Sequence, residues 1–133
     1  MNAAFAQILA VAAGGAAGTL LRHGANLLLP KAAQHPFSLA TLAVNTLGCL
    51  LAGVVIAWLE QRQVDEIWRL LLLTGVLGGL TTFSAFGVDL LHLLRAGRWG
   101  WMLATVSAHV GLGLVAIVLG WKLARLTLLP GSG

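Results

Sequence analysis

The chain has 133 residues, of which 59% are hydrophobic and only 9% are charged, and its formal net charge is +4. Its mean hydropathy is +0.92, and soluble domains carry about 25% charged residues. This composition excludes an ordinary soluble domain and indicates a membrane protein with little mass outside the bilayer. The basic residues are dispersed at the ends of apolar segments and form no face or run, so nucleic acid is not an expected partner. With a single cysteine, Cys49, the chain can form no internal disulfide.

Four apolar segments follow one another along the chain, and each has the roughly 20 residues that a spanning helix needs. They cover residues 3–29, 37–59, 67–94 and 99–123. The five tryptophans all lie within a few residues of a segment end, where indole rings gather at the two membrane surfaces. We therefore predict an all-α membrane protein with four transmembrane helices. Residues 1–129 would form a single transmembrane domain, inserted in the inner (plasma) membrane, and residues 130–133 a flexible tail.

Small residues recur at a spacing that lets helices approach closely. Gly14 and Gly18 are four residues apart, and so are Gly75 and Gly79. Small residues at this spacing allow backbones to meet inside a bilayer. The pattern predicts close helix contacts, either within one chain or between two copies.

The Lys and Arg residues are divided equally between the two sides of the membrane. Four spans place the N-terminus, the second connector and the C-terminal tail on one side, which holds Arg62, Arg69, Lys122 and Arg125. The opposite side holds Arg22, Lys31, Arg95 and Arg98. An excess of positive charge on one side normally fixes the orientation. The balance predicts insertion in both orientations and an antiparallel, dual-topology homodimer, unless one loop or one unusually placed charge breaks the tie.

The third segment contains a run that differs from an ordinary spanning helix. Residues 74–87 read TGVLGGLTTFSAFG, with glycines, hydroxyls and two phenylalanines where leucine is usual. Irregular backbone at membrane depth is tolerated only where protein buries it or where it lines a cavity. We therefore predict a broken third helix, with this run as the selective part of a passive pore for a small anion. Carbonyls released near Gly78 and Thr81 could coordinate a hard cation such as Na⁺.

The polar side chains in the core of the segments are uncharged. They include Asn45 in the second segment, Thr82 and Ser84 in the third, and Ser107 in the fourth. A buried amide needs hydrogen-bond partners, so Asn45 either joins two helices or faces the pore. Neutral donors can replace part of the hydration of an ion and still release it.

Phe83 and Phe86 are three residues apart and share one face of a helix. They either pack in the core or against lipid, or they turn their ring edges toward the pore. The edge carries the positive part of the aromatic quadrupole. It can therefore face an anion without a full charge that would trap it.

Two other functions remain as alternatives. A small exporter of drugs or cations would need an ionisable group in the bilayer core, and Asp89, near the end of the third segment, is the only acid there. A membrane scaffold without transport would use Asn45 and the two phenylalanines for packing alone. No arrangement of acids, histidines and serines suits hydrolysis, so we do not expect an enzyme.

Three pieces of sequence give the chain a resemblance to a known family. They are GGAAG at residues 14–18 followed by Arg22, NTLG at residues 45–48, and GVLGGLTTFSAF at residues 75–86. In their order and spacing the chain resembles the small fluoride channels of the CrcB/Fluc family over nearly its whole length. The resemblance implies a fluoride-selective channel that relieves cytoplasmic fluoride toxicity. It also implies a dual-topology homodimer with two antiparallel pores and a central structural Na⁺.

The resemblance also implies roles for single residues. Gly78 and Thr81 would give Na⁺ their main-chain carbonyls from both subunits. Phe83 and Phe86 would be the pore-lining rings whose edges meet fluoride. Asn45 would donate its amide to the ion or orient those rings.

Other implied roles concern the entrance and the path. Arg22 would sit in a vestibule and raise the local anion concentration. A polar track would be formed by Thr82, Ser84 and Ser107. One departure matters, because Leu103 stands where the resemblance leads us to expect a tyrosine. A hydroxyl contact to Asn45 would then be missing, with an effect on rate or pore hydration more than on selectivity.

Overall fold

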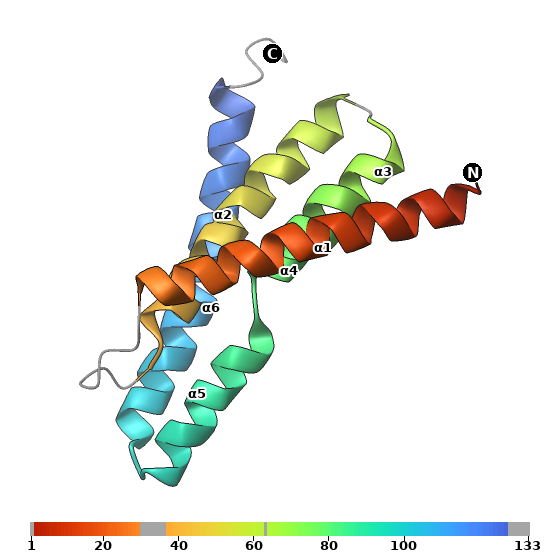
Figure 1. Ribbon diagram of the computed structural model, residues 1–133. Coiled ribbons are helices and arrows are strands. Elements are labelled where there is room, and N and C mark those ends of the chain that lie inside the picture. Colours follow the sequence, from red (N-terminus) through yellow and green to blue (C-terminus); the bar gives the residue numbers. More distant parts are fainter. Residues whose placement is uncertain (1, 30–36, 63, 128–133) are drawn as a thin grey trace.

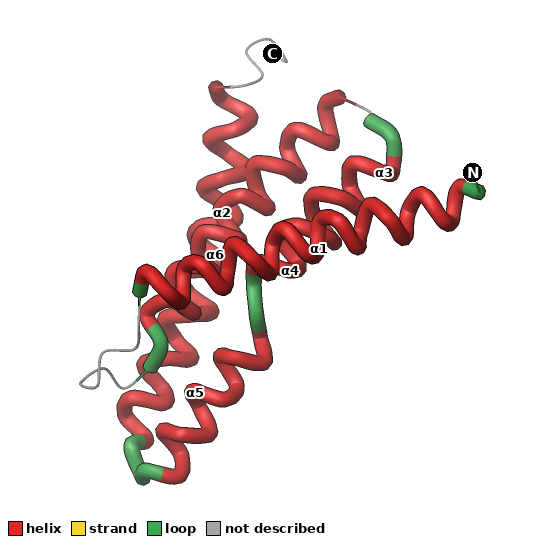
Figure 2. The backbone as a smooth tube through the Cα atoms, viewed as in Figure 1, coloured by secondary structure: helices red, strands yellow, loops and turns green. Residues whose placement is uncertain are grey.

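The computed structural model describes residues 2–29, 37–62 and 64–127, and the regular structure in these ranges is entirely helical (Figures 1 and 2). The elements are α1 (Ala3–Leu28), α2 (Leu39–Arg62), α3 (Glu66–Arg69), a π-helical segment η1 (Leu70–Leu77), α4 (Gly78–Leu80), α5 (Phe83–Arg95) and α6 (Trp99–Thr127). The predicted tail at 130–133 and the basic residue Lys31 lie outside the described residues.

Four stretches are long and apolar enough to cross a membrane: Ala3–Leu28, Leu39–Arg62, Glu66–Arg95 and Trp99–Thr127. Each agrees with a predicted segment to within a few residues, so the all-α fold with four spans is confirmed. Large apolar side chains cover the outside of the helices. Leu20, for example, is 70% exposed and Leu126 is 75% exposed, as expected for surfaces that face lipid or another copy.

The helices form two closely packed groups. α2 and α6 pack against each other along their lengths, and α1 packs against η1 and α4. α5 leaves the α1 group and packs against α6 instead, so the third span changes its neighbour between α4 and α5 (Figure 1). This change of neighbour occurs at the run that the sequence singles out.

Glycines make the close packing of α1 possible. A Cβ atom on Gly18 would collide with the carbonyl oxygen of Val76, and one on Gly14 would collide with that of Leu71. In the other direction, a Cβ on Gly79 would lie 2.6 Å from the carbonyl oxygen of Gly15. The predicted close contacts are therefore made within one chain, backbone against backbone.

The tight turn between α5 and α6 ends the third span. Gly97 has φ of 66°, a left-handed conformation that glycine adopts without a steric penalty. The N–H of Gly97 donates to the carbonyl of Leu94, and that of Arg98 donates to the carbonyl of Leu93. This pair of bonds is a Schellman motif, which satisfies the last carbonyls of α5 and lets α6 start at once.

Tryptophans mark one end of the molecule. Trp58 at the end of α2 packs edge-on against Trp68 of α3, with ring centroids 6.5 Å apart. Close by, the indole N–H of Trp121 donates to Glu60 at 3.2 Å, and Arg125 lies over the Trp121 ring. Apolar rings with polar partners at a span end agree with the predicted aromatic belt.

Candidate functional site

The backbone is extended for two residues between α4 and α5. α4 ends at Leu80, after which Thr81 has φ −81° and ψ 154° and Thr82 has φ −149° and ψ 117°, and α5 starts at Phe83. We call Thr81 and Thr82 the extended pair. Thr81 closes the preceding turn, because both its N–H (3.0 Å) and its hydroxyl (2.8 Å) donate to the carbonyl of Leu77.

Asn45 of α2 holds the extended pair through both the nitrogen and the oxygen of its side-chain amide. Its Nδ2 donates to the carbonyl of Thr82 at 3.1 Å, and its Oδ1 accepts from the N–H of Thr82 at 2.8 Å. The side chain thus supplies to Thr82 the donor and the acceptor that a neighbouring strand would supply. The predicted interhelical hydrogen bond of Asn45 is present, and it is made to backbone.

These bonds release two carbonyl groups from helical hydrogen bonding. In a continuous α-helix the N–H of Thr82 would donate to the carbonyl of Gly78, and that of Ala85 to the carbonyl of Thr81. Here the first N–H is bonded to Asn45, and the second donates to the hydroxyl of Thr82 at 3.3 Å. The carbonyls of Gly78 and Thr81, the two that the sequence singled out, therefore lose their usual donors and are suited to bind a hard cation.

Arg22 of α1 binds the end of α4 from another side. Its Nε donates to the carbonyl of Gly79 at 3.1 Å. A positive group at a helix C-terminus also interacts favourably with the helix dipole. Arg22 thus reaches the backbone immediately before the extended pair.

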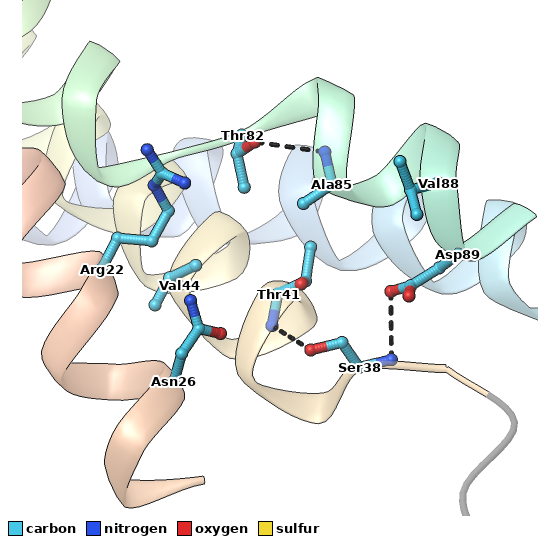
Figure 3. A pocket seen from close by; sticks show the side chains of 9 residues that line it. All are labelled: Arg22, Asn26, Ser38, Thr41, Val44, Thr82, Ala85, Val88 and Asp89. Carbon is cyan, nitrogen blue, oxygen red and sulfur yellow. Dashed lines mark hydrogen bonds between the residues drawn. The ribbon is translucent and has the colours of Figure 1, made fainter. Parts of the chain in front are cut away.

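A cavity of about 300 Å³ lies on the Arg22 side of the extended pair. Figure 3 shows Arg22 of α1 and Asp89 of α5 at opposite ends of it, with Thr82 and Thr41 between them. Asp89 is only 3% exposed, and its carboxylate accepts from the N–H of Ser38 at 3.1 Å. The Ser38 hydroxyl accepts in turn from the N–H of Thr41 and caps α2.

A second cavity of about 290 Å³ lies on the other side of the extended pair. Its lining comprises Asn45, Cys49, Thr81, Thr82, Phe83, Phe86, His109 and Val110. Thr82 lines both cavities. A polar residue with extended backbone therefore stands between two spaces large enough to hold water.

The two phenylalanines adjoin one another in the second cavity. Their ring centroids are 5.5 Å apart and the planes are inclined by 56°. Phe86 is 7% exposed in the single chain, whereas Phe83 is 83% exposed. Phe86 is therefore fixed by its own chain, and Phe83 projects from it.

The structure brings most, but not all, of the predicted site residues together. Ser84 joins the site, because its hydroxyl lies 3.2 Å from that of Thr82. Ser107 is exposed on α6 and is not among the residues that line either cavity. Leu103 is 63% exposed, and the Asn45 amide that a tyrosine there was expected to meet is bonded to Thr82.

Three residues of the second cavity, Cys49, His109 and Val110, were not assigned to the site from the sequence. Cys49 lies one helical turn after Asn45 on α2, a spacing that could have placed it there. His109 lies one turn after Thr105 on α6. The pairing of α5 with α6, which brings His109 to Phe86, could not be deduced from either segment alone.

The chain is similar to known proteins over most of its length. A family model described as "CrcB-like protein, Camphor Resistance (CrcB)" matches residues 9–121. The chain is 44% identical over 115 residues to "Fluoride-specific ion channel FluC 2" of Symbiobacterium thermophilum, covering 86% of this chain and 94% of that protein. It is 44% identical over 115 residues to "Fluoride-specific ion channel FluC" of Aromatoleum aromaticum (85% and 86%) and 39% identical over 125 residues to the protein of that name from Methylobacillus flagellatus (92% and 97%).

Proposed function

Because the chain belongs to the CrcB-like family and is a multi-pass membrane protein, we propose that it is a fluoride-selective channel of the plasma membrane. It would let fluoride leave the cytoplasm passively and so relieve toxicity. The observation that carries the proposal is the extended pair, which Asn45 holds between two cavities. We infer that the third transmembrane helix is interrupted there, at the point where ions pass.

The chemistry of the site suits a small, strongly hydrated anion. Thr82 and Ser84 offer hydroxyl donors, and Phe83 and Phe86 offer ring edges, whose partial charge is positive. The side-chain amide of Asn45 has two N–H donors. One of them donates to the carbonyl of Thr82, which leaves the other. These groups are neutral, so they can replace part of the hydration shell without holding the ion permanently. Arg22, in the first cavity, would raise the anion concentration there.

The two alternative functions fit less well. An exporter would use Asp89 as its exchanging group, but Asp89 is buried and already accepts the N–H of Ser38, with which it fixes the start of α2. A scaffold would have no need of two cavities on either side of an extended pair. The relatives named above, moreover, are named as fluoride channels.

We further propose an antiparallel homodimer with Na⁺ at its centre. The proposal is supported by the balanced basic charges, by the exposed apolar faces and by Phe83, whose ring is largely uncovered in the single chain. The carbonyls of Gly78 and Thr81 fit the ion, because the donors that a continuous helix would give them are bonded elsewhere. Two copies would supply four such oxygens. A bound Na⁺ would hold the two extended pairs together.

The dimer and its cation can be tested together. In detergent with Na⁺ the protein should have a mass of two chains of 13.8 kDa by light scattering. After exhaustive dialysis into a large organic cation, fluoride flux from reconstituted vesicles should fall, and adding Na⁺ back should restore it. A single-chain mass in Na⁺, or flux indifferent to the exchange, contradicts this proposal.

The proposed function itself predicts selective leakage. Vesicles that contain the protein should release fluoride, recorded with a fluoride electrode, while they retain chloride. Phe86→Ile should lower the fluoride rate at least about tenfold, because an alkyl group offers no positive edge. Leu91→Ile, an equally conservative change at a 43% exposed position of α5, is the matched control and should leave the rate unchanged. Equal release of chloride and fluoride by the unaltered protein would end the proposal.

A further inference from the structure

A third ring continues the pair formed by Phe83 and Phe86. The imidazole of His109 on α6 has its centroid 4.5 Å from that of Phe86, with the planes inclined by 39°. Phe86 thus contacts both a ring of its own helix, 5.5 Å away, and a ring of a neighbouring helix. All three residues line the second cavity.

The orientation of the His109 ring is itself fixed. Its Nδ1 lies 3.0 Å from the carbonyl oxygen of Thr105, one turn earlier on α6. A carbonyl only accepts, so Nδ1 must carry the hydrogen and donate it. Nε2 is buried with no hydrogen-bond partner among the residues that the structure describes. The imidazole is therefore bonded to the backbone of α6 through one nitrogen, and its ring packs against Phe86.

The residue that carries this tether does not move easily. Thr105 is completely buried, and its hydroxyl donates to the carbonyl of Trp101 at 2.7 Å. α6 is a continuous helix through this region. The chain of contacts from Thr105 through His109 to Phe86 therefore joins a rigid helix to a ring at the ion pathway.

We propose that His109 is a positioning residue for Phe86, whose imidazole sets the angle at which Phe86 turns its edge to the passing ion. This inference rests on the proposed function. Without the imidazole, Phe86 would lose the contact on its α6 side and could tilt into the vacated space. A displacement of about 1 Å at a reacting or binding centre can cost up to two orders of magnitude in rate. A tilting ring would also discriminate less well between fluoride and the larger chloride.

Three substitutions of His109 distinguish the contribution of its ring from that of its polar atoms. His109→Phe keeps a ring against Phe86, His109→Gln keeps polar atoms without a ring, and His109→Ala keeps neither. We expect His109→Phe to stay within about threefold of the unaltered fluoride rate and the other two to fall at least about tenfold. Their fluoride-to-chloride flux ratio should fall as well. His92→Ala removes an exposed histidine of α5 and should change nothing.

The outcomes are distinguishable. If the unaltered protein leaks no fluoride, the proposed function fails and this inference fails with it. If it leaks and all three variants match it, or if His109→Gln is active while His109→Phe is not, only the role of His109 is overturned. Should His109→Ala not fold, as judged by gel filtration, the comparison of the Phe and Gln variants decides alone, because both keep most of the side-chain volume.

Discussion

Replacing Asn45 by alanine is expected to abolish fluoride flux and to destabilise the protein at the same time. The change removes both hydrogen bonds to Thr82 and leaves the N–H and the carbonyl of this half-buried residue without these partners. An unsatisfied group costs about 1–3 kcal/mol when it is fully buried, and less where water can reach it. Because Asn45 is what keeps Thr82 out of the helix, the extended pair should relax, and the Thr82 N–H should return to the carbonyl of Gly78.

Asn45→Asp provides the sharper comparison. A carboxylate still accepts from the Thr82 N–H, but it cannot donate to the Thr82 carbonyl and it repels an anion. We expect this variant to fold better than Asn45→Ala and to conduct no better. Thermal denaturation in detergent and fluoride efflux from vesicles measure the two effects separately. Full flux in either variant would show that the amide of Asn45 takes no part in conduction.

Gly18→Ala is expected to destabilise the protein by overpacking the contact between α1 and the third span. The new methyl group would occupy the position of the Val76 carbonyl oxygen and approach the Leu80 nitrogen to 2.8 Å. Backbone atoms cannot move aside as a flexible side chain can, so α1 must shift away from η1 and α4. Overpacking of this kind costs about 1–3 kcal/mol. The shift would also draw Arg22, one turn later on α1, away from the carbonyl of Gly79.

The matched control is Gly15→Ala on the same helix. A Cβ atom there meets nothing within 4 Å, and alanine is the better helix former. This variant should unfold within about 0.5 kcal/mol of the unaltered protein. The denaturation midpoints of the two variants, measured side by side, test the packing. Equal midpoints would contradict the close approach of α1 to Val76.

The four spans could be predicted from the sequence, because the composition and length of each segment can be read from that segment alone. Apolar runs of sufficient length specified all four spans, and tryptophans mark an end of the second, third and fourth. The run at 74–87 contains the two residues whose backbone is extended, and Asn45 was singled out because a buried amide needs partners. That Asn45 bonds to Thr82, however, is a relation between two helices. No spacing within a single segment could reveal it.

Contacts between helices also explain why His109 was not predicted at the site. They explain as well why Ser107 is not at the site in the single chain. His109 reaches Phe86 only because α5 leaves α1 and packs against α6, a change of neighbour that no periodicity records. Ser107, two residues away on α6, points about 200° around the helix from His109 and is exposed. Whether a polar residue of α6 lines the cavity thus depends on the rotation of that helix, which close packing with α2 determines.

The bonds between Asn45 and Thr82 also bear on how the chain enters the membrane during synthesis. The second span precedes the third along the chain. The bilayer core offers no hydrogen-bond partner to an unpaired N–H and carbonyl. A third span that enters the membrane with Thr82 extended therefore needs the second span beside it.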